Sequence, residues 1–225
     1  MTRLAIPWYV HPAEDPAQWT RLAELADRIA FVVVNVASGP GEADDPYYPE
    51  ALAALRSSGV TFYGYVDTAY AERGIVQVAA DIRVWLERYD VDGIMFDQVA
   101  PGPDGLGYNR MLATIARQAG ARAIVANPGV RPCPELLGLF DVTCVFEDTA
   151  GSHGSVVSDG TGESAAWAVG PERLWHLVYD VPVEELDAVL ARVDAAGAGL
   201  AFVTDRAGPH PWTGLPSPLA RFSQC

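Results

Sequence analysis

The sequence predicts an α/β fold, a single (β/α)₈ barrel of the TIM type that takes in residues 1–225 as one domain. Three observations lead to this expectation. Short apolar runs rich in β-branched residues alternate with amphipathic helical patterns along the chain. The runs end at intervals of about thirty residues, which is the length of one βα unit, and eight such units fit into the chain. A hydrophobic content of 50% is enough for one large core.

The expected strands are apolar on both faces, as parallel strands covered on both sides are. They span residues 3–9, 29–36, 60–66, 91–97, 121–126, 140–147, 173–179 and 199–204. An open, doubly wound sheet is the rival arrangement, and it would normally carry a glycine-rich fingerprint after its first strand. Tyr9-Val10-His11-Pro12 has no such pattern. The closed barrel is therefore favoured.

Helical patterns lie between these strands. Asp15-Pro16 supplies an N-cap and a first-turn proline for the first helix, whose apolar stripe includes Trp19 and Leu22. Further helices are expected over residues 75–89 and 183–196, each with an apolar face. Residues 148–165 are rich in Gly, Ser, Thr and Asp and follow the sixth strand. We expect them to form a loop on the active face and a candidate lid.

Composition excludes several classes of function. Fifteen basic residues against 29 acidic ones give a net charge of −14, which disfavours nucleic acids and anionic membranes as partners and attracts cationic ligands. All fifteen basic residues are arginine. Schiff-base aldolases, pyridoxal-phosphate enzymes and P-loop proteins each need a lysine, so all three are excluded.

No metal, other cofactor or membrane span is expected. The three cysteines are too scattered for a zinc site or a disulfide scaffold, and the histidines lack metal-ligand spacing. No apolar run reaches the 18 or more residues that a membrane helix needs. The N-terminal residues read as a strand rather than as a signal peptide. A cytoplasmic location is expected, or a secreted one if a leader has been removed.

In a barrel, the residues at the carboxyl ends of the strands build the site. Here these ends are rich in acids, amides and aromatic rings and poor in cations, a set that suits sugars better than phosphorylated substrates. The predicted substrate-binding residues are Tyr9, His11, Asn35, Asp67, Tyr70, Gln98, Asn127, Tyr179, Asp205 and Trp212. Trp212 could stack on a sugar ring or plug the side of the barrel, whereas Tyr65, Trp85, Trp175 and His176 are expected in the core.

Asp97 and Glu147 are the predicted catalytic residues, because each ends an apolar strand pattern on a carboxylate. The two-residue period of a strand places Asp97 on the same face as Met95, and Glu147 on the same face as Val145 and Thr143. Two partly desolvated carboxylates that face one cavity split their proton affinities, so that one is the acid and the other the anion. Glycoside hydrolysis uses such a pair.

Several short motifs, in this order and spacing, resemble the spherulation-specific family 4 (spherulin-4-like) proteins, and the resemblance covers nearly the whole chain. The motifs are Ile6-Pro7-Trp8-Tyr9, Asn35 through Gly41, Gly64 through Tyr70, Asp92 through Asp97, Asn127-Pro128-Gly129, Val145-Phe146-Glu147, Thr204-Asp205, and Pro211-Trp212 with Leu215-Pro216-Ser217. That family includes fungal endo-α-1,4-galactosaminidases. The resemblance implies a barrel that hydrolyses α-1,4-linked galactosamine or N-acetylgalactosamine polymers through Asp97 and Glu147.

One position departs from the family pattern. Better-studied members have a glutamate after the aspartate of the fourth strand, and this chain has Gln98 there. The substitution keeps the shape and the hydrogen bonding but removes a charge. Either this neighbour only positions other groups, or the protein is slower, altered in its substrate, or inactive.

The function expected from these observations is hydrolysis of an amino-sugar polysaccharide or oligosaccharide, with Asp97 as nucleophile and Glu147 as general acid/base, or with these roles reversed. An acetamido group of the substrate could instead act as the internal nucleophile, with Asp97 as its stabiliser. A sugar-binding barrel without useful catalysis is the main alternative. A third possibility is a hydrolase or lyase that acts on a small sugar.

Overall fold

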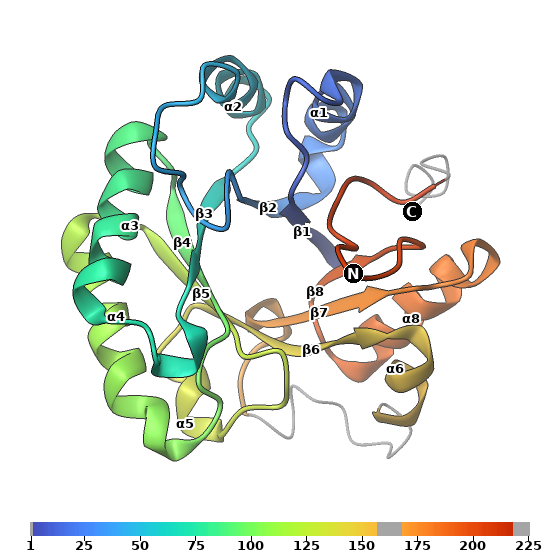
Figure 1. The fold of residues 1–225 in the computed structure, drawn as a ribbon. Helices are drawn as coiled ribbons and strands as arrows, with labels where there is room; N and C mark the ends of the chain where they lie inside the picture. The colour runs from blue at the N-terminus through green and yellow to red at the C-terminus, as the bar shows by residue number, and fades with distance from the viewer. Residues whose placement is uncertain (1, 157–167, 218–225) are drawn as a thin grey trace.

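Eight parallel strands form a closed barrel in the order β1 to β8, as the computed structural model of the chain shows (Figure 1). The structure describes residues 2–156 and 168–217. The strands are β1 (Arg3–Trp8), β2 (Ile29–Val34), β3 (Phe62–Asp67), β4 (Gly93–Asp97), β5 (Ala123–Asn127), β6 (Val142–Thr149), β7 (Leu174–Tyr179) and β8 (Leu200–Val203). Pairing of Arg3 with Leu200 and of Leu4 with Ala201 closes the ring. The predicted (β/α)₈ barrel is confirmed.

Helices cover the outside of the barrel, and α3 and α4 lie side by side against it (Figure 1). The helices are α1 (Pro16–Glu24), α2 (Tyr48–Ser57), α3 (Ile75–Arg88), α4 (Leu106–Ala119), α5 (Pro134–Leu137), α6 (Ala150–Val156) and α8 (Leu186–Ala196). Asp15 caps α1 as expected, since its carboxylate accepts a hydrogen bond from the backbone N–H of Gln18. Gly120 and Gly197 end α4 and α8 in the left-handed conformation.

The prediction of a loop over residues 148–165 is wrong for its first nine residues, 148–156. β6 continues through Thr149, and α6 follows it directly from Ala150. The strand continues because Asp148 and Thr149 pair with Val178 and Tyr179 of β7, and a tertiary partner of this kind outweighs the low strand propensity of Asp. Residues 157–165 lie outside the described part of the chain.

Aromatic rings fill the floor of the barrel. Phe31 stacks on Tyr63 with ring centres 4.8 Å apart and meets Trp175 edge-on at 5.4 Å. Gly93 makes room for this layer, because a Cβ there would lie 2.9 Å from the Tyr63 ring. The indole of Trp175 donates to the carbonyl oxygen of Ala5 at 3.0 Å, so its polar atom is paired. These rings pack together across the barrel interior, and the polar groups lie nearer the carboxyl ends of the strands.

Gly64 allows α3 to approach β3. A Cβ at Gly64 would lie 2.4 Å from two ring atoms of Trp85, which is fully buried and donates to the carbonyl oxygen of Tyr65. We expect Gly64→Ala to lower the free energy of unfolding by about 1–3 kcal/mol, because the rigid indole has nowhere to move. Chemical denaturation measures this change.

Gly107 in α4 is the matched control for this substitution. A Cβ at Gly107 meets nothing within 4 Å, so Gly107→Ala should leave the stability unchanged or raise it by up to about 1 kcal/mol. Equal stabilities of the two variants would show that the contact between Gly64 and Trp85 is loose.

No helix in residues 2–156 or 168–217 is long and apolar enough to cross a membrane.

Candidate functional site

The carboxyl ends of β3, β4 and β5 bring three polar residues into one layer. Asp67 pairs in register with Asp97, and Asp97 pairs with Asn127. Neighbouring residues of a parallel sheet that are in register point to the same face. The predicted residues Asp67, Asp97 and Asn127 therefore stand side by side at the mouth of the barrel.

Asn127 bridges the two predicted catalytic carboxylates. Its Nδ2 donates to Oδ1 of Asp97 at 2.9 Å and to Oε2 of Glu147 at 2.5 Å. Its Oδ1 accepts from the backbone N–H of Gly129 at 3.0 Å, which fixes the orientation of the amide, and the residue is buried. Asn127 was predicted to bind substrate, but this amide nitrogen already spends both of its protons on Asp97 and Glu147.

A bulge in β6 turns Glu147 into the barrel. Cys144 pairs with Trp175 and Phe146 pairs with His176, so the register shifts by one residue between them. Val145 and Phe146 both pack outward, in a cluster with residues of α8. The expectation that Glu147 shares a face with Val145 and Thr143 is wrong, because the extra residue breaks the two-residue alternation.

Tyr65 belongs to the site, although it was expected only in the core. Its ring is buried and meets Tyr9 edge-on at 5.7 Å, while its hydroxyl donates to Oδ2 of Asp97 at 2.8 Å. Asp97 also accepts a hydrogen bond from the backbone N–H of Gln98. The alternation of strand residues could have identified Tyr65, since it lies two positions before Asp67 on the inner face.

Burial shifts the proton affinity of both carboxyl groups upward. Desolvation raises the pKa of Glu147 to about 7; the hydrogen bond from Asn127 opposes the shift and the charge of Asp97 adds to it. Desolvation also raises the pKa of Asp97, against the hydrogen bonds from Tyr65, Gln98 and Asn127. Near neutral pH the pair can therefore hold one proton and one negative charge, as general acid/base chemistry requires.

Three predicted tyrosines surround this pair. Desolvation raises the pKa values of Tyr9, Tyr70 and Tyr179, and the negative charge of Glu147 contributes to each shift. The charge of Asp97 acts on Tyr9 and Tyr70 as well. All three hydroxyls are thus neutral donors in the field of the carboxylates. Tyr70 is 53% exposed, so its ring is open to a ligand.

Thr68 is a positioning residue that the sequence did not reveal. It is fully buried, and its hydroxyl lies 2.7 Å from the carbonyl oxygen of Gln98 and 3.0 Å from that of Asp97. The following residues 69–71 and Gln98 all have positive φ angles, a conformation that is costly for non-glycine residues. Hydrogen bonds donated by Thr68 and by the backbone N–H of Tyr70 to the carbonyl oxygens of Asp97 and Gln98 hold these strained turns together.

Several predicted binding residues are engaged in fixing loops. Oδ1 of Asn35 accepts from the backbone N–H of Gly39, and Oδ1 of Asp67 accepts from that of Ala69. Asp205 accepts from the backbone of Ser217. These three side chains shape the rim of the mouth, and each carboxylate or amide retains further capacity for hydrogen bonding.

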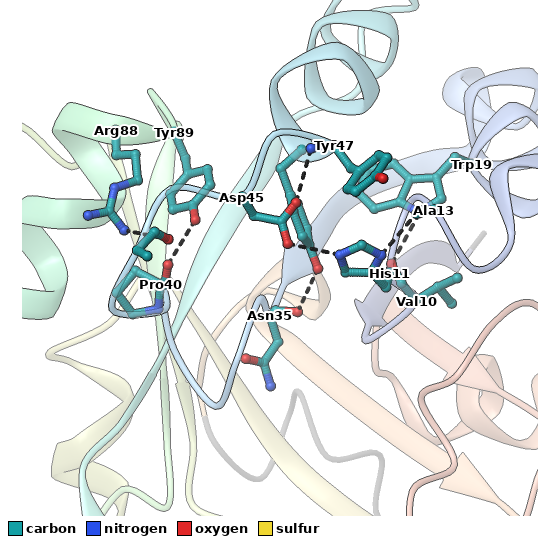
Figure 2. Close-up of polar contacts among 12 residues, drawn as sticks. Val10, His11, Ala13, Trp19, Asn35, Pro40, Asp45, Tyr47, Arg88 and Tyr89 are labelled. Atoms are coloured by element: carbon teal, nitrogen blue, oxygen red, sulfur yellow. Dashed lines mark hydrogen bonds and ion pairs between the residues drawn. The ribbon is translucent and has the colours of Figure 1, made fainter.

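His11 and Trp212, both predicted to bind substrate, have partners of their own outside the carboxylate pair. Nε2 of His11 lies 2.9 Å from Oδ2 of Asp45, on the side of α1 and α2 (Figure 2). Trp212 is buried and packs edge-on against Tyr179 and tilted against Phe202. Of its two predicted roles, the structure favours packing at the barrel wall. His176 is a buried core histidine, paired with His153 at 3.0 Å, as expected.

No group of three His, Cys, Asp or Glu residues within residues 2–156 and 168–217 is arranged to hold a metal ion. The donors at the mouth are carboxylates, amides and phenols that hydrogen-bond to each other or to the backbone. Their arrangement is suited to proton transfer and to binding hydroxyl groups.

Comparison with known proteins places these residues in a family. The sequence model of Spherulation-specific family 4 matches residues 3–225. Spherulin-4 of Physarum polycephalum is 30% identical over 156 residues, which make up 67% of this chain and 46% of that protein. The chain thus spans less than half the length of this curated relative.

Solved structures share the fold. The crystal structure of Sph3 from Aspergillus clavatus, in complex with GalNAc, superposes with a TM-score of 0.83 at 26% identity and covers 98% of this chain and 95% of Sph3. A fungal endo-β-N-acetylglucosaminidase of glycosyl hydrolase family 18 superposes with a TM-score of 0.61 at 12% identity, covering 94% of this chain and 95% of that one. At 12% identity, the second likeness supports the barrel fold alone.

Proposed function

The chain belongs to Spherulation-specific family 4, and from that premise we propose that it is a glycoside hydrolase that cleaves an amino-sugar polymer of the α-1,4-linked galactosamine or N-acetylgalactosamine type. The observation that carries the proposal is the pair Asp97 and Glu147, held face to face by Asn127 at the mouth of the barrel. The GalNAc bound to Sph3 supports the amino-sugar class of substrate.

The hydrogen bonds suggest how the two carboxyl groups divide the work. Asp97 accepts from Tyr65, Asn127 and the backbone of Gln98, and three donors favour its ionised form. Glu147 accepts only from Asn127 among these donors, and its pKa lies at about 7. We assign Asp97 as the nucleophile and Glu147 as the general acid that protonates the leaving oxygen.

The geometry supports retention of the anomeric configuration. Both carboxylates bond to the same nitrogen, Oδ1 of Asp97 at 2.9 Å and Oε2 of Glu147 at 2.5 Å, so their nearest oxygens are closely spaced. Retaining enzymes place their carboxyl groups about 5–5.5 Å apart, whereas inverting enzymes need about 6.5–9.5 Å to admit a water molecule. In the retaining reaction Asp97 forms the bond to the anomeric carbon as Glu147 gives its proton to the departing oxygen. Glu147 then takes a proton from the water that releases the sugar.

The surrounding tyrosines suit the substrate. Tyr70 offers an exposed ring, and the hydroxyls of Tyr9, Tyr70 and Tyr179 are neutral and lie in the field of the carboxylates. Apolar ring faces of sugars pack on aromatic rings, and sugar hydroxyls exchange hydrogen bonds with phenols and carboxylates. We therefore propose that the three tyrosines line the subsites on either side of the cleaved bond.

A carbohydrate-binding barrel with little or no catalysis is the second candidate, and Gln98 favours it. Gln98 follows Asp97 directly, where the family pattern has a carboxylate. Its amide cannot exchange a proton with substrate or with Asp97. The two candidates differ in turnover and agree on the ligand.

Product analysis separates them. We expect incubation with α-1,4-linked N-acetylgalactosamine polymer, alongside β-1,4-linked chitin and chitosan oligosaccharides, to yield shorter chains only from the α-linked polymer. Proton NMR during the first turnovers should show the α anomer, as retention requires. The β anomer first would contradict the assignment of Asp97 as nucleophile. Binding of the α-linked polymer without any products would establish the binding barrel instead.

A further inference from the structure

A groove of about 530 Å³ lies between α1 and α2, outside the barrel mouth. Its size is within the range of small-molecule sites. Small residues on the facing sides of the two helices, such as Ala23 and Ala51, leave this space unfilled. One end is formed by the loops after β1 and β2, at Pro12 and Pro46, so the groove opens on the same side as the carboxylate pair.

The groove carries an exposed aromatic ring that is held in place. Tyr47 lines it and is 56% exposed. The carboxylate of Asp45 accepts from the backbone N–H of Tyr47 at 3.0 Å and pairs with His11 at 2.9 Å (Figure 2). The ring of His11 meets that of Tyr47 edge-on, with centres 5.6 Å apart. Because these contacts order Tyr47 beforehand, a ligand that stacks on it loses little additional freedom.

The groove also offers charge. Glu50 lines it and makes no hydrogen bond or ion pair with any residue of the described chain. Asp45 and the exposed Glu14 lie close by, since both charges act on Tyr48. Arg88 pairs with Asp44, so this neighbouring cation is already engaged. An uncompensated carboxylate beside an aromatic ring fits a sugar ring that carries an ammonium group.

We propose that this groove is a second carbohydrate site, which binds a hexosamine unit with a free amine through Tyr47 and Glu50. The proposal rests on the proposed function, because the ligand is a distant unit of the same amino-sugar polymer. The bound polysaccharide would run from the carboxylate pair past Tyr9 and His11 into the groove. Both residues follow β1: the charges of Asp97 and Glu147 act on Tyr9, and the ring of His11 contacts Tyr47 in the groove.

The test compares a long and a short substrate. With a partly deacetylated α-1,4-galactosaminan and a trisaccharide as substrates, Tyr47→Ala should raise the ratio of polymer KM to trisaccharide KM by about threefold to tenfold, with kcat unchanged. Tyr47→Phe keeps the ring face and should keep the ratio. Met111→Ala, a change at an exposed residue of α4, is the surface control. An unchanged ratio in Tyr47→Ala overturns the proposal.

Glu50→Gln tests the charge. The variant should weaken binding of the partly deacetylated polymer and leave binding of the fully N-acetylated polymer as it is. Weakening of both to the same extent would show that Glu50 does not bind an amine. Trilysine should not compete with the polymer for the groove, since it has no ring to stack on Tyr47. If trilysine competed as well as the polymer, the groove would bind any cation, and the proposal of a carbohydrate site would be wrong.

Direct binding keeps the proposal separate from the hydrolase assignment. The indole of Trp19 lines the groove and donates to the carbonyl oxygen of Val10 at 3.1 Å, so its N–H resonance reports on the groove. Titration of Glu147→Gln protein with the polymer should shift this resonance, and added Tyr47→Ala should abolish the shift. If the wild type hydrolyses no glycan, the same titration can be done with the wild-type protein. That outcome would contradict the hydrolase assignment but not the groove site. Polymer binding with no shift at Trp19 contradicts the groove.

Discussion

Asp97→Asn and Glu147→Gln should each lower kcat on the amino-sugar polymer by about 10²–10⁴-fold or more, because each removes a group that acts on the breaking bond. Both variants keep the shape of the side chain and the hydrogen bond from Asn127 to an oxygen atom. Affinity for oligosaccharides should therefore remain largely intact. Initial rates with polymer, together with calorimetric titration of an oligosaccharide, measure the two quantities.

Azide can tell the two roles apart. In Glu147→Ala the glycosyl intermediate on Asp97 still forms with an activated substrate, and azide should release it as the α-glycosyl azide. In Asp97→Ala azide takes the place of the missing carboxylate and should give the β-glycosyl azide. The reverse assignment of products would show that Glu147 is the nucleophile. Glu87→Gln, a change at an exposed carboxylate near the end of α3, should keep both kcat and the anomer.

The pH dependence of activity should follow the carboxylate pair. Catalysis needs Glu147 protonated, so kcat/KM should fall as pH rises above about 7, approaching tenfold for each pH unit. On the acidic side kcat/KM should fall where Asp97 takes up a proton, at a pH above the usual range of an aspartate because burial raises its pKa. The two limbs belong to the pair as a whole. A flat profile up to about pH 9 would contradict Glu147 as the acid.

The raised pKa of Glu147 should also make the free energy of unfolding depend on pH. The folded-state pKa of Glu147, about 7, lies above its usual value of 4.5, so the folded protein binds more protons than the unfolded chain between these values. This contribution to stability is fully present below about pH 4.5 and is lost as pH rises to about 7. Glu147→Gln should hence be more stable than the wild type at about pH 8, by about 2–3 kcal/mol.

Denaturation of both proteins at two pH values checks this expectation. The advantage of Glu147→Gln should be largest at about pH 8 and should shrink at about pH 4. A variant that is less stable at both pH values would mean that burial of the ionised Glu147 carboxylate does not destabilise the folded protein. Such a result would also remove the physical basis for its role as the acid.

The barrel could be predicted from sequence because its strands are short runs of β-branched and aromatic residues at regular intervals. Each predicted strand ends within two residues of the observed one at either end; β2, for example, was expected over residues 29–36 and spans Ile29–Val34. Asp97 and Glu147 could be chosen for the same reason, since a carboxylate that ends an apolar run lies at the mouth of a barrel.

The remaining features depend on contacts between distant segments. The bulge in β6 leaves no local signal, because Val145 and Phe146 are both apolar and suit either face. The bridge formed by Asn127 needs the register of β5 against both neighbours. Nothing in the sequence around Thr68 marks it as a positioning residue. Its role comes from hydrogen bonds to the carbonyl oxygens of Asp97 and Gln98, which lie about thirty residues away. The pairing of His11 with Asp45 joins two loops that are 34 residues apart.

Closure of the ring between β8 and β1 has a consequence for how copies of the molecule meet. Each of the eight strands has a hydrogen-bonded neighbour on both sides, so among the described strands none offers a free edge to another chain. A free edge is the usual template for strand addition and for fibrous aggregation. Any self-association of this protein would have to use helices or loops, and concentrated solutions should resist amyloid-like assembly for as long as the barrel stays shut.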